Sequence, residues 1–483
     1  MNYRMVFYVL GRLLFSLGAL MLLPLFCAVL YREAVVPFLV PMLIALALGF
    51  LFSYKKPENN RFLARDGFVS VGLSWVVMSL VGCLPYILSG AIPSFIDAFF
   101  ETVSGFSTTG ATVIGDIEAQ AKSILFWRCF TQWIGGMGVL VFILAILPRS
   151  DMKNANFMHL MRAEVPGPTV GKLVSKISST ARVLYGIYIL LTLAQIILLS
   201  FGEMSLFEAV THSFSTAGTG GFGVKNDSFA SYSAYSQYVT AVFMILFGTN
   251  LNVFFLLLTG HFIRAIKSEE LRWYLGIMAA ATAGIFLSIS LSSAFSEENF
   301  RHGFFQVASM MTTTGFSSAD FELWPVFTHV VIILLMFCGG CAGSTSGGMK
   351  ISRLILLFKN GKREVRYIAH PRSMISVKLE GKTVDHETIR GTTSYIIMFA
   401  ALFVVSALAV IAIEGCDLVT GFTSVATSLN NVGPGLAEVG PTDTFAHLAG
   451  GTKLVLCFDM LAGRLELFPM LMLFSPYAWK RHS

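Results

Sequence analysis

The sequence contains few charged residues for its length. Asp, Glu, Lys and Arg together make up 13% of the 483 residues, whereas about 25% is usual in soluble domains. Hydrophobic residues make up 55% of the chain. This composition excludes an ordinary soluble globular protein, because most of the chain must lie in a medium that does not hydrate charge, namely lipid.

The sequence also lacks the usual signatures of an enzyme. The seven cysteines show no metal-ligand spacing, and most lie inside apolar runs, where they are expected to pack as small side chains. We find no nucleophile–base pair, metal-ligating cluster or nucleotide motif, so we expect neither an enzyme nor a covalently bound cofactor. The net charge of +6 is modest, and no nucleic-acid partner is expected.

What the sequence does contain is a series of long apolar runs. Runs of about 18–25 residues match the length of a helix that crosses a bilayer, whereas a barrel would show alternating segments of roughly 10 residues. We therefore expect an all-α polytopic membrane protein. Its ten predicted transmembrane helices lie near residues 8–30, 36–53, 68–90, 125–148, 183–201, 236–262, 271–293, 326–349, 392–413 and 451–476.

Basic residues concentrate in every second connection between these runs. The basic connections are 53–66, 148–182, 258–272 and 350–390, and the chain ends in Lys480, Arg481 and His482. Connections such as 89–110 contain almost no Lys or Arg. Because cytoplasmic loops are enriched in Lys and Arg, both termini are predicted to lie in the cytoplasm, a parity that ten spans satisfy.

The connections that are poor in basic residues contain short apolar stretches followed by Gly and hydroxyl residues. These stretches, about three helical turns or fewer, are too short to span a bilayer. Irregular backbone at membrane depth is tolerated only where protein or a water-filled cavity surrounds it. Each connection is therefore predicted to enter the membrane and return, and the stretches are Ile96–Phe106, Leu206–Phe214, Phe304–Met311 and Leu418–Leu429.

The four connections align with one another as an internal repeat of about 100 residues. The aligned segments are Phe106-Ser107-Thr108-Thr109-Gly110, Phe214-Ser215-Thr216-Ala217-Gly218, Met311-Thr312-Thr313-Thr314-Gly315 and Leu429-Asn430-Asn431-Val432-Gly433. Small residues in membrane helices often serve only in packing, but four matched segments in four matched units favour a common role. Four such units around one axis are predicted to form a pseudo-fourfold pore with four re-entrant loops.

These residue types suit a cation that leaves water. Such an ion exchanges its hydration shell for fixed oxygens, and Gly gives the backbone the freedom to turn carbonyls inward. Thr, Ser and Asn add uncharged oxygens, and the C-terminal ends of short helices carry partial negative charge. A scaffold or sensor without transport has no need of aligned oxygens, and an anion pore would carry Arg or Lys at these positions.

A glycine-rich segment interrupts the eighth apolar run between Gly339 and Lys350. Each Gly in a helix costs roughly 1 kcal/mol relative to Ala, so the helix is predicted to break there. A phosphate-binding P-loop does not fit, because no Gly-Lys-Ser/Thr follows and the segment adjoins an apolar run.

Arg464 lies within the last apolar run, with Asp459 and Glu466 nearby. A charge at this depth costs about 2.5–3.5 kcal/mol or more, so it faces a partner or a water path. Two roles for Arg464 remain open. It can form a clamp with a carboxylate between helices, or it can lie on the ion path, and the two roles can coexist.

The sequence resembles the Trk/Ktr/HKT superfamily of K⁺ transporters over essentially its whole length. The motifs that carry the resemblance are Ser107-Thr108-Thr109-Gly110, Thr216-Ala217-Gly218-Thr219-Gly220-Gly221-Phe222, Thr312-Thr313-Thr314-Gly315-Phe316-Ser317, Asn430-Asn431-Val432-Gly433-Pro434-Gly435, Gln132-Trp133-Ile134-Gly135-Gly136-Met137-Gly138 and Gly463-Arg464-Leu465-Glu466. The predicted organisation is two additional N-terminal helices over 1–66 and repeats over 67–180, 181–268, 269–390 (with the broken helix) and 391–483.

The resemblance implies roles for particular residues. The K⁺-binding selectivity filter would comprise Thr108, Thr109, Gly110, Thr216, Ala217, Gly218, Thr313, Thr314, Gly315, Asn431, Val432 and Gly433. An intramembrane gate would comprise Gly339, Gly340, Gly343, Gly347, Gly348 and Lys350, and Arg464 would be an electrostatic barrier in the pore. In some relatives a Ser replaces the first filter Gly and Na⁺ is preferred, so four glycines favour K⁺.

The resemblance also implies partners and location. It implies a homodimer in the bacterial inner membrane, with K⁺ as the transported ion and lipid around it. A separate cytoplasmic TrkA-like subunit that binds NAD(H) or ATP would gate the pore, although the basic connections can equally reflect topology alone. A cation- or proton-coupled symporter is the alternative, because Asp97, Glu101, Glu208 and His212 flank the first two pore segments.

Overall fold

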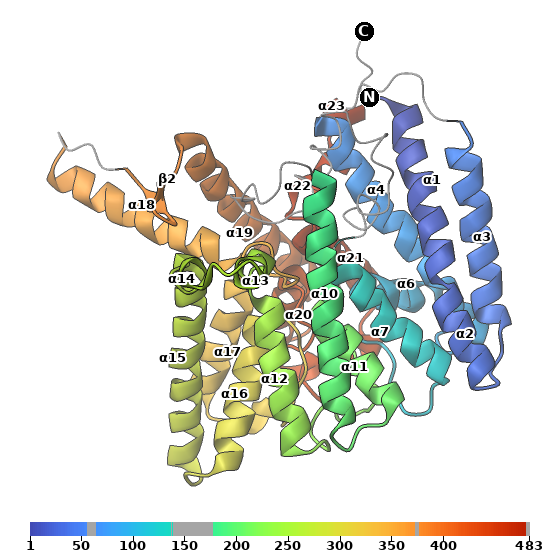
Figure 1. The fold of residues 1–483 in the computed structure, drawn as a ribbon, viewed down its shortest axis with the longest axis horizontal. Helices are drawn as coiled ribbons and strands as arrows, with labels where there is room; N and C mark the ends of the chain where they lie inside the picture. The colour runs from blue at the N-terminus through green and yellow to red at the C-terminus, as the bar shows by residue number, and fades with distance from the viewer. Residues whose placement is uncertain (56–63, 137, 139–176, 372–375, 480–483) are drawn as a thin grey trace.

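The computed structural model describes residues 1–55, 64–136, 138, 177–371 and 376–479. Most of its long helices are aligned along one axis, up or down, and form one bundle (Figure 1). The second half of the span predicted at 125–148 and most of the basic connection 148–182 lie outside the described residues. The same is true of Lys480, Arg481 and His482 at the C-terminus.

The predicted membrane spans are helical. Six helical segments in the described part of the chain are long and apolar enough to cross a membrane: Tyr3–Leu30, Val36–Ser53, Arg65–Ser89, Arg182–Ser200, Glu269–Ser292 and His386–Glu414. A bent pair, Ala234–Gly248 with Leu251–Leu258, provides a seventh. Shorter helices at Lys122–Gly136, Val326–Cys338 and Gly450–Arg464 occupy the other predicted positions. The predicted polytopic helical membrane fold is thus confirmed, and the helices in the described part of the chain are consistent with ten spans.

Three helices precede the repeated units: α1 (Tyr3–Leu20), α2 (Leu22–Leu30) and α3 (Val36–Ser53). α1 and α3 lie side by side at one edge of the bundle (Figure 1). Their backbones come close, because a Cβ added at Gly49 would lie 2.7 Å from the backbone nitrogen of Phe15. Small residues permit this close packing in lipid, where no hydrophobic force holds helices together.

The rest of the chain follows one pattern four times: a long helix, a short pore helix and a second helix. The first unit contains α4 (Ala64–Gly82), α5 (Leu84–Ser89), pore helix α6 (Phe95–Phe106) and α7 (Lys122–Gly136). The second contains α10 (Ile177–Ser200), pore helix α11 (Leu206–Gly218), α12 (Ala234–Gly248), α13 (Leu251–Leu258) and α14 (Phe262–Ile266).

The third unit contains α15 (Glu269–Ser292), pore helix α16 (Glu297–Met311), the 3₁₀ turn η1 (Phe321–Leu323), α17 (Val326–Cys338) and α18 (Ile351–Ala369). The fourth contains α19 (His386–Glu414), pore helix α20 (Leu418–Asn430), the turns η2 (Ala437–Val439) and η3 (Phe445–His447), α21 (Gly450–Arg464), α22 (Phe468–Phe474) and α23 (Pro476–Trp479). A small antiparallel hairpin, β1 (Lys378–Leu379) and β2 (Lys382–Thr383), joins these two units.

Two predicted spans are not continuous helices. The eighth breaks after Cys338 as predicted, and α18 then leaves the bundle (Figure 1). The sixth was predicted as one helix over 236–262, which is wrong: α12 and α13 meet at 93°. The bend arises because Thr249 is extended and the side chain of Asn250 caps the new helix by accepting from the N–H of Asn252.

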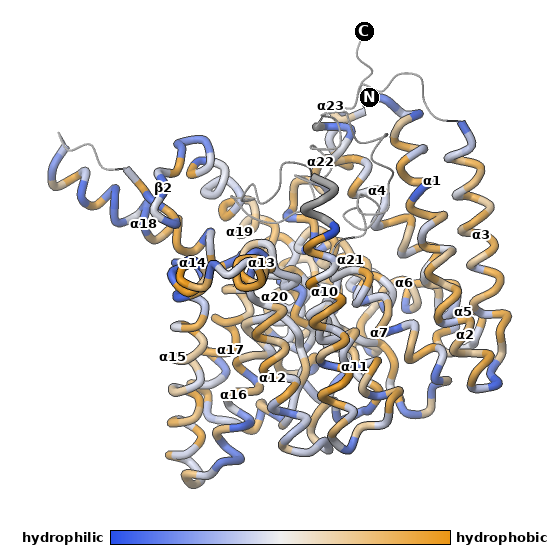
Figure 2. Tube along the Cα trace, in the orientation of Figure 1, coloured by the Kyte–Doolittle hydropathy of each residue, from blue (hydrophilic) through white to orange (hydrophobic). Residues whose placement is uncertain are grey.

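Apolar residues follow the length of the long helices, and polar residues gather toward the ends of the bundle (Figure 2). The hydroxyl of Tyr3 donates to the carbonyl of Trp479 at 2.6 Å. The first and last helices therefore meet at one end of the bundle, the end from which α18 projects (Figure 1).

Candidate ion pathway

The four pore helices end in loops that share one backbone geometry. A residue with left-handed backbone follows each helix, and these residues are Thr108 (φ 59°), Thr219 (φ 54°), Thr313 (φ 57°) and Asn431 (φ 56°). A glycine with positive φ stands two positions later, namely Gly110 (88°), Gly221 (82°), Gly315 (84°) and Gly433 (105°). The predicted fourfold repeat is therefore present in the backbone itself.

The residue between each such pair ties its loop to the pore helix. Its N–H donates to a carbonyl five residues earlier, and the four bonds are Thr109 to Ser104 (2.9 Å), Gly220 to Ser215 (2.9 Å), Thr314 to Ser309 (2.8 Å) and Val432 to Thr427 (2.8 Å). The same bond in all four loops gives four similar turns, which present their carbonyls in equivalent ways.

The four loops form a closed ring. A Cβ added at each glycine would strike a carbonyl oxygen of the next loop: Gly110 against Gly220 O (2.2 Å), Gly221 against Thr314 O (2.2 Å), Gly315 against Val432 O (2.0 Å) and Gly433 against Thr109 O (2.7 Å). Only glycine combines this space with the required positive φ. The ring thus places four backbone carbonyls around one axis.

The structure corrects the predicted position of the second loop. Thr216, Ala217 and Gly218 belong to the last turn of α11, and the residue equivalent to Gly110 is Gly221. Gly218 is a packing residue, because its Cβ would lie 2.3 Å from the carbonyl oxygen of Gln132 in α7. A sequence signal for the correct alignment existed: Gly221-Phe222 matches Gly315-Phe316.

Side-chain oxygens extend the ring of carbonyls. Thr108 Oγ1 and Asn431 Oδ1 are buried and have no hydrogen-bond partner among the described residues. Asn431 Nδ2 donates to Thr109 Oγ1 at 3.0 Å and so joins the fourth loop to the first. Uncharged oxygens of this kind replace the hydration shell of a cation, and the pore helices direct their negative dipole ends toward the same region.

Carboxylates do not surround this ring as they would surround a resident metal ion. Among the described residues, no group of three His, Cys, Asp or Glu side chains could hold a metal ion. Exposed carboxylates occur on the loop that leads from Gly110 to α7. Asp116 accepts from the side-chain amide of Asn226 at 3.1 Å, and this bond lowers the pKa of its carboxyl.

A buried ion pair supports the first two loops from behind. Arg128 Nε lies 2.6 Å from Glu101 Oε1, with the two side chains 1% and 0% exposed. Glu101 also accepts from the N–H of Val113 at 2.9 Å, and Arg128 donates to the carbonyl of Gly223 at 3.0 Å. The pair therefore joins pore helix α6, α7 and the segments that follow the first two loops of the ring.

Gln132 of α7 supports the second loop directly. Its Nε2 donates to the carbonyl oxygen of Gly220 at 2.6 Å, and its Oε1 accepts from the N–H of Phe222 at 3.1 Å. The Ser215 hydroxyl also donates to Oε1. One of the four ring carbonyls is thus held by a side chain, so the ring is not equivalent in all its quadrants.

The broken eighth span forms a buried loop against the ring. We call residues 339–350 the gate loop because they include the predicted gate residues, and φ is positive at Gly339, Gly343, Gly348 and Lys350. The N–H of Gly347 donates to Thr313 Oγ1 at 2.6 Å, and a Cβ added at Gly347 would lie 2.4 Å from the carbonyl oxygen of Asn430.

Two basic side chains bind carbonyls of the gate loop. Lys350 Nζ donates to the carbonyl of Ser346. Arg464 Nη1 donates to the carbonyl of Thr345 at 2.6 Å. Gly340, the remaining predicted gate residue, accepts from the N–H of Ile351 at 3.0 Å. All six predicted gate residues thus lie within one folded loop.

Arg464 also connects this loop to the first unit. Its Nη2 donates to the carbonyls of Gly135 and Gly136 at 2.6 and 2.8 Å. The two carboxylates considered as clamp partners have other contacts: Asp459 accepts from the Ser406 hydroxyl at 2.7 Å, and Glu466 pairs with Arg353. Arg464 of α21 therefore bridges three backbone carbonyls in two other segments, α7 and the loop 339–350.

Comparison with known proteins agrees with this geometry. Residues 38–481 match the TrkH family model, described as cation transport protein. The chain belongs to the TrkH family. It is 37% identical to the Trk system potassium uptake protein TrkH of Salmonella typhimurium and 33% identical to TrkG of Escherichia coli, with 99% of this chain and 100% and 99% of those proteins covered.

A solved structure of the same family has the same fold. The crystal structure of the potassium transporter TrkH from Vibrio parahaemolyticus superposes with a TM-score of 0.89 at 34% identity, over 99% of this chain and 100% of that one. The resemblance inferred from the motifs is thereby confirmed.

The sequence interpretation missed two supports of the ring in this TrkH-family chain. Gln132 was recognised only as part of a motif, and Arg128 was not singled out. Both are polar residues inside the apolar run predicted at 125–148, and that position was the available signal, because polar groups in lipid require partners.

Proposed function

We propose that this chain is the pore-forming, channel-like subunit of a Trk-type K⁺ uptake system in the bacterial inner membrane. The observation that carries the proposal is the closed ring of carbonyls at Thr109, Gly220, Thr314 and Val432. A ring of uncharged oxygens selects a dehydrated monovalent cation. The names of the relatives, which are potassium uptake proteins and a potassium transporter, specify K⁺.

The proposed filter comprises the residues of the ring and their neighbours. It consists of Thr108, Thr109, Gly110, Thr219, Gly220, Gly221, Thr313, Thr314, Gly315, Asn431, Val432 and Gly433. The second segment replaces the one first predicted, because Gly221 has the backbone of the other three glycines. We assign these segments to four units that begin with α4, α10, α15 and α19, so the unit boundaries predicted at 67, 181 and 391 move to 64, 177 and 386.

The proposed gate is the loop 339–350, with Arg464 as its latch and as an electrostatic barrier. The loop lies directly against Thr313 and Asn430 of the ring. Opening therefore requires the loss of the bonds from Arg464 to Thr345 and from Gly347 to Thr313. A cytoplasmic nucleotide-binding subunit would shift this balance, and we assign both termini to the cytoplasm and a homodimer to the assembly.

The alternative, a cation- or proton-coupled symporter, is less well supported. Three of the four groups that suggested it have structural roles: Glu101 pairs with Arg128, Asp97 pairs with Lys453 at 2.5 Å, and Glu208 caps α11. The fourth, His212, contacts the hydroxyl of Tyr232 at 3.1 Å. A proton relay needs groups that exchange partners, and these contacts favour a fixed scaffold.

Uptake of Rb⁺ or K⁺ into cells that lack other K⁺ importers tests the proposal. We expect uptake that depends on expression of this chain and on Gly315. A correctly inserted protein that gives no uptake, with its Trk-type regulatory subunit present, overturns it.

A further inference from the structure

The gate loop rests on the bend between α12 and α13. We call residues 247–251 the elbow. The N–H of Cys341 donates to the carbonyl of Gly248 at 2.9 Å, and the N–H of Leu251 donates to the carbonyl of Gly343 at 3.2 Å. These bonds hold residues 341–343 of the gate loop against the elbow, so a displacement of the elbow also displaces the loop.

The elbow turns the chain nearly perpendicular to α12. Because α12 runs along the bundle and α13 departs at 93°, α13 and α14 lie across the end of the bundle (Figure 1). α14 exposes Phe262 (58%), Ile263 (70%) and Ile266 (67%), next to the exposed Arg264 and Lys267. Exposed apolar and basic residues together are typical of a helix that lies in the headgroup region of a bilayer.

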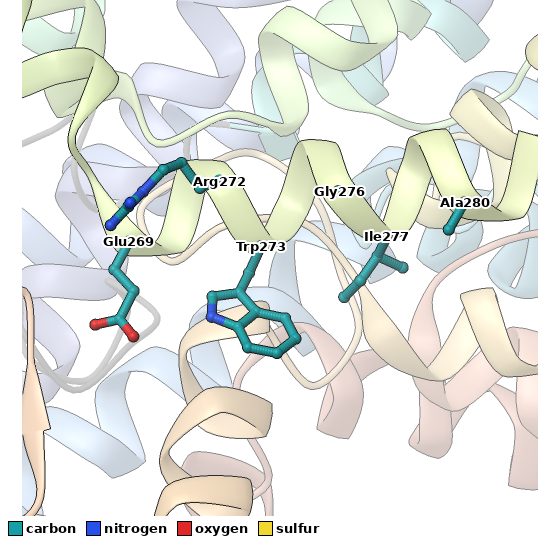
Figure 3. Close-up of a pocket in the computed structure, with 6 residues that line it drawn as sticks. All are labelled: Glu269, Arg272, Trp273, Gly276, Ile277 and Ala280. Atoms are coloured by element: carbon teal, nitrogen blue, oxygen red, sulfur yellow. The ribbon is translucent and has the colours of Figure 1, made fainter.

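An open cavity lies along the first turns of α15, the helix that follows α14 in the chain. Its volume is about 510 Å³, and it is lined by Glu269, Arg272, Trp273, Gly276, Ile277 and Ala280. Figure 3 shows the two charged side chains at the beginning of the helix, with Ile277 and Ala280 further along it. A cavity that is charged at one end and apolar along the rest has the polarity of a phospholipid.

The acids of this region have partners within the protein. Glu269 pairs with Lys359 at 2.5 Å. The carboxylate of Glu270 accepts from the N–H of Ala342 at 2.7 Å, which attaches the first turn of α15 to the gate loop. The carboxylate of Glu380 also lies there, because it accepts from the Ser268 hydroxyl at 2.9 Å and from the N–H of Glu270 at 3.1 Å. The exposed Arg264, Lys267 and Arg272 outnumber Glu270 and Glu380, and the resulting positive surface attracts anionic headgroups.

We propose that the cavity at the start of α15, together with α14, binds an anionic phospholipid of the cytoplasmic leaflet and that the bound lipid stabilises the gate loop in its closed position. The phosphate lies against Arg272 and Lys267, and an acyl chain follows Ile277 and Ala280. Occupancy immobilises the turn that contains Glu270 and the adjacent elbow, which hold the gate loop. The gating part of this inference rests on the proposed transport function.

Reconstitution of the full chain in vesicles tests the inference. Phosphatidylcholine vesicles with added phosphatidylglycerol are expected to show lower K⁺ flux than phosphatidylcholine vesicles alone. The double variant Lys267→Gln/Arg272→Gln is expected to lose this response, because each basic residue near an anionic surface strengthens association about fivefold. Lys55→Gln, an exposed lysine after α3, is the matched control and keeps the response.

Binding is measured independently of transport. Brominated phosphatidylglycerol is expected to quench the fluorescence of Trp273, which is 45% exposed at the cavity. The quenching that comes from Trp273 is expected to disappear in Trp273→Phe. In the double variant it is expected to require a higher content of brominated phosphatidylglycerol.

Several results overturn the inference. One is a response to phosphatidylglycerol that is the same in the double variant and in Lys55→Gln. A second is quenching that Trp273→Phe does not change. A third is a decrease in K⁺ flux in phosphatidylcholine vesicles on addition of inorganic phosphate that equals the decrease with phosphatidylglycerol, because this result identifies a free anion as the ligand. Absence of flux in every vesicle, also when the Trk-type regulatory subunit is added, refutes the proposed transport function instead, and the quenching measurement still decides the lipid site.

Discussion

Replacement of Arg464 by Ala is expected to raise K⁺ flux. The guanidinium holds the gate loop through its bond to the carbonyl of Thr345, and a hydrogen bond from a charged group contributes about 1.5–3 kcal/mol. Loss of this bond shifts the balance between closed and open loop by about 10- to 150-fold, because each 1.4 kcal/mol is a factor of ten. Flux rises by that factor until the gate is fully open.

The measurement is Rb⁺ uptake in cells that lack other K⁺ importers, with flux into vesicles as the second assay. Arg464→Lys separates the latch from the charge, because an ammonium keeps the charge but lacks the fork that reaches two carbonyls at once. We expect an intermediate flux for this variant. Arg4→Ala, which removes an exposed arginine of α1, is the control and is expected to leave flux unchanged.

The bonds to Gly135 and Gly136 complicate the Ala variant, because they also connect α21 to α7. The unfolding temperature in detergent is therefore measured for each variant. An Arg464→Ala protein that is folded as well as its parent and conducts no faster refutes the role of Arg464 as latch and barrier.

Three further predictions concern the ring and the loop. Gly221→Ser and Gly315→Ser are each expected to raise Na⁺ permeation relative to K⁺ in vesicle flux assays, and an unchanged ratio for Gly221→Ser would restore the original alignment of the second loop. Glu101→Gln is expected to destabilise the protein by about 3–5 kcal/mol, because it leaves the Arg128 charge buried without its partner; an unchanged unfolding temperature would contradict this. Gly347→Ala is expected to raise basal flux, because the added methyl group displaces the gate loop from Asn430, and flux equal to that of the parent would show that the loop does not occlude the pore.

Hydropathy and turn chemistry were sufficient to predict much of this molecule. The spans and the break after Cys338 follow from local composition, because lipid requires apolar helices and clustered glycines disfavour a helix. Gly110, Gly315 and Gly433, which the sequence predicts as filter glycines, have the shared backbone geometry, and their role in selectivity stays a prediction. These features depend on residues that are close together in the sequence.

The features that were missed depend on contacts between distant segments. α11 continues through Gly218 because Gln132 of another helix lies against it, and no property of the segment 214–218 alone reveals that contact. The bend itself follows from the extended Thr249 and the Asn250 cap, but its bonds to the loop 339–350 join segments about 90 residues apart in the chain. The partner of Glu101 likewise comes from the next helix of the unit.

The ring of four loops is encoded by a single chain, and this has a consequence for how such a pore changes over generations. In a pore made of four identical subunits, one codon change alters all four loops at once. The ion site must then tolerate four changes together, or it loses ion binding. Here one codon change alters one quadrant and leaves three intact. Selectivity can therefore change one loop at a time through functional intermediates. One loop, such as the second, which Gln132 holds, can diverge while the other three keep the ion bound.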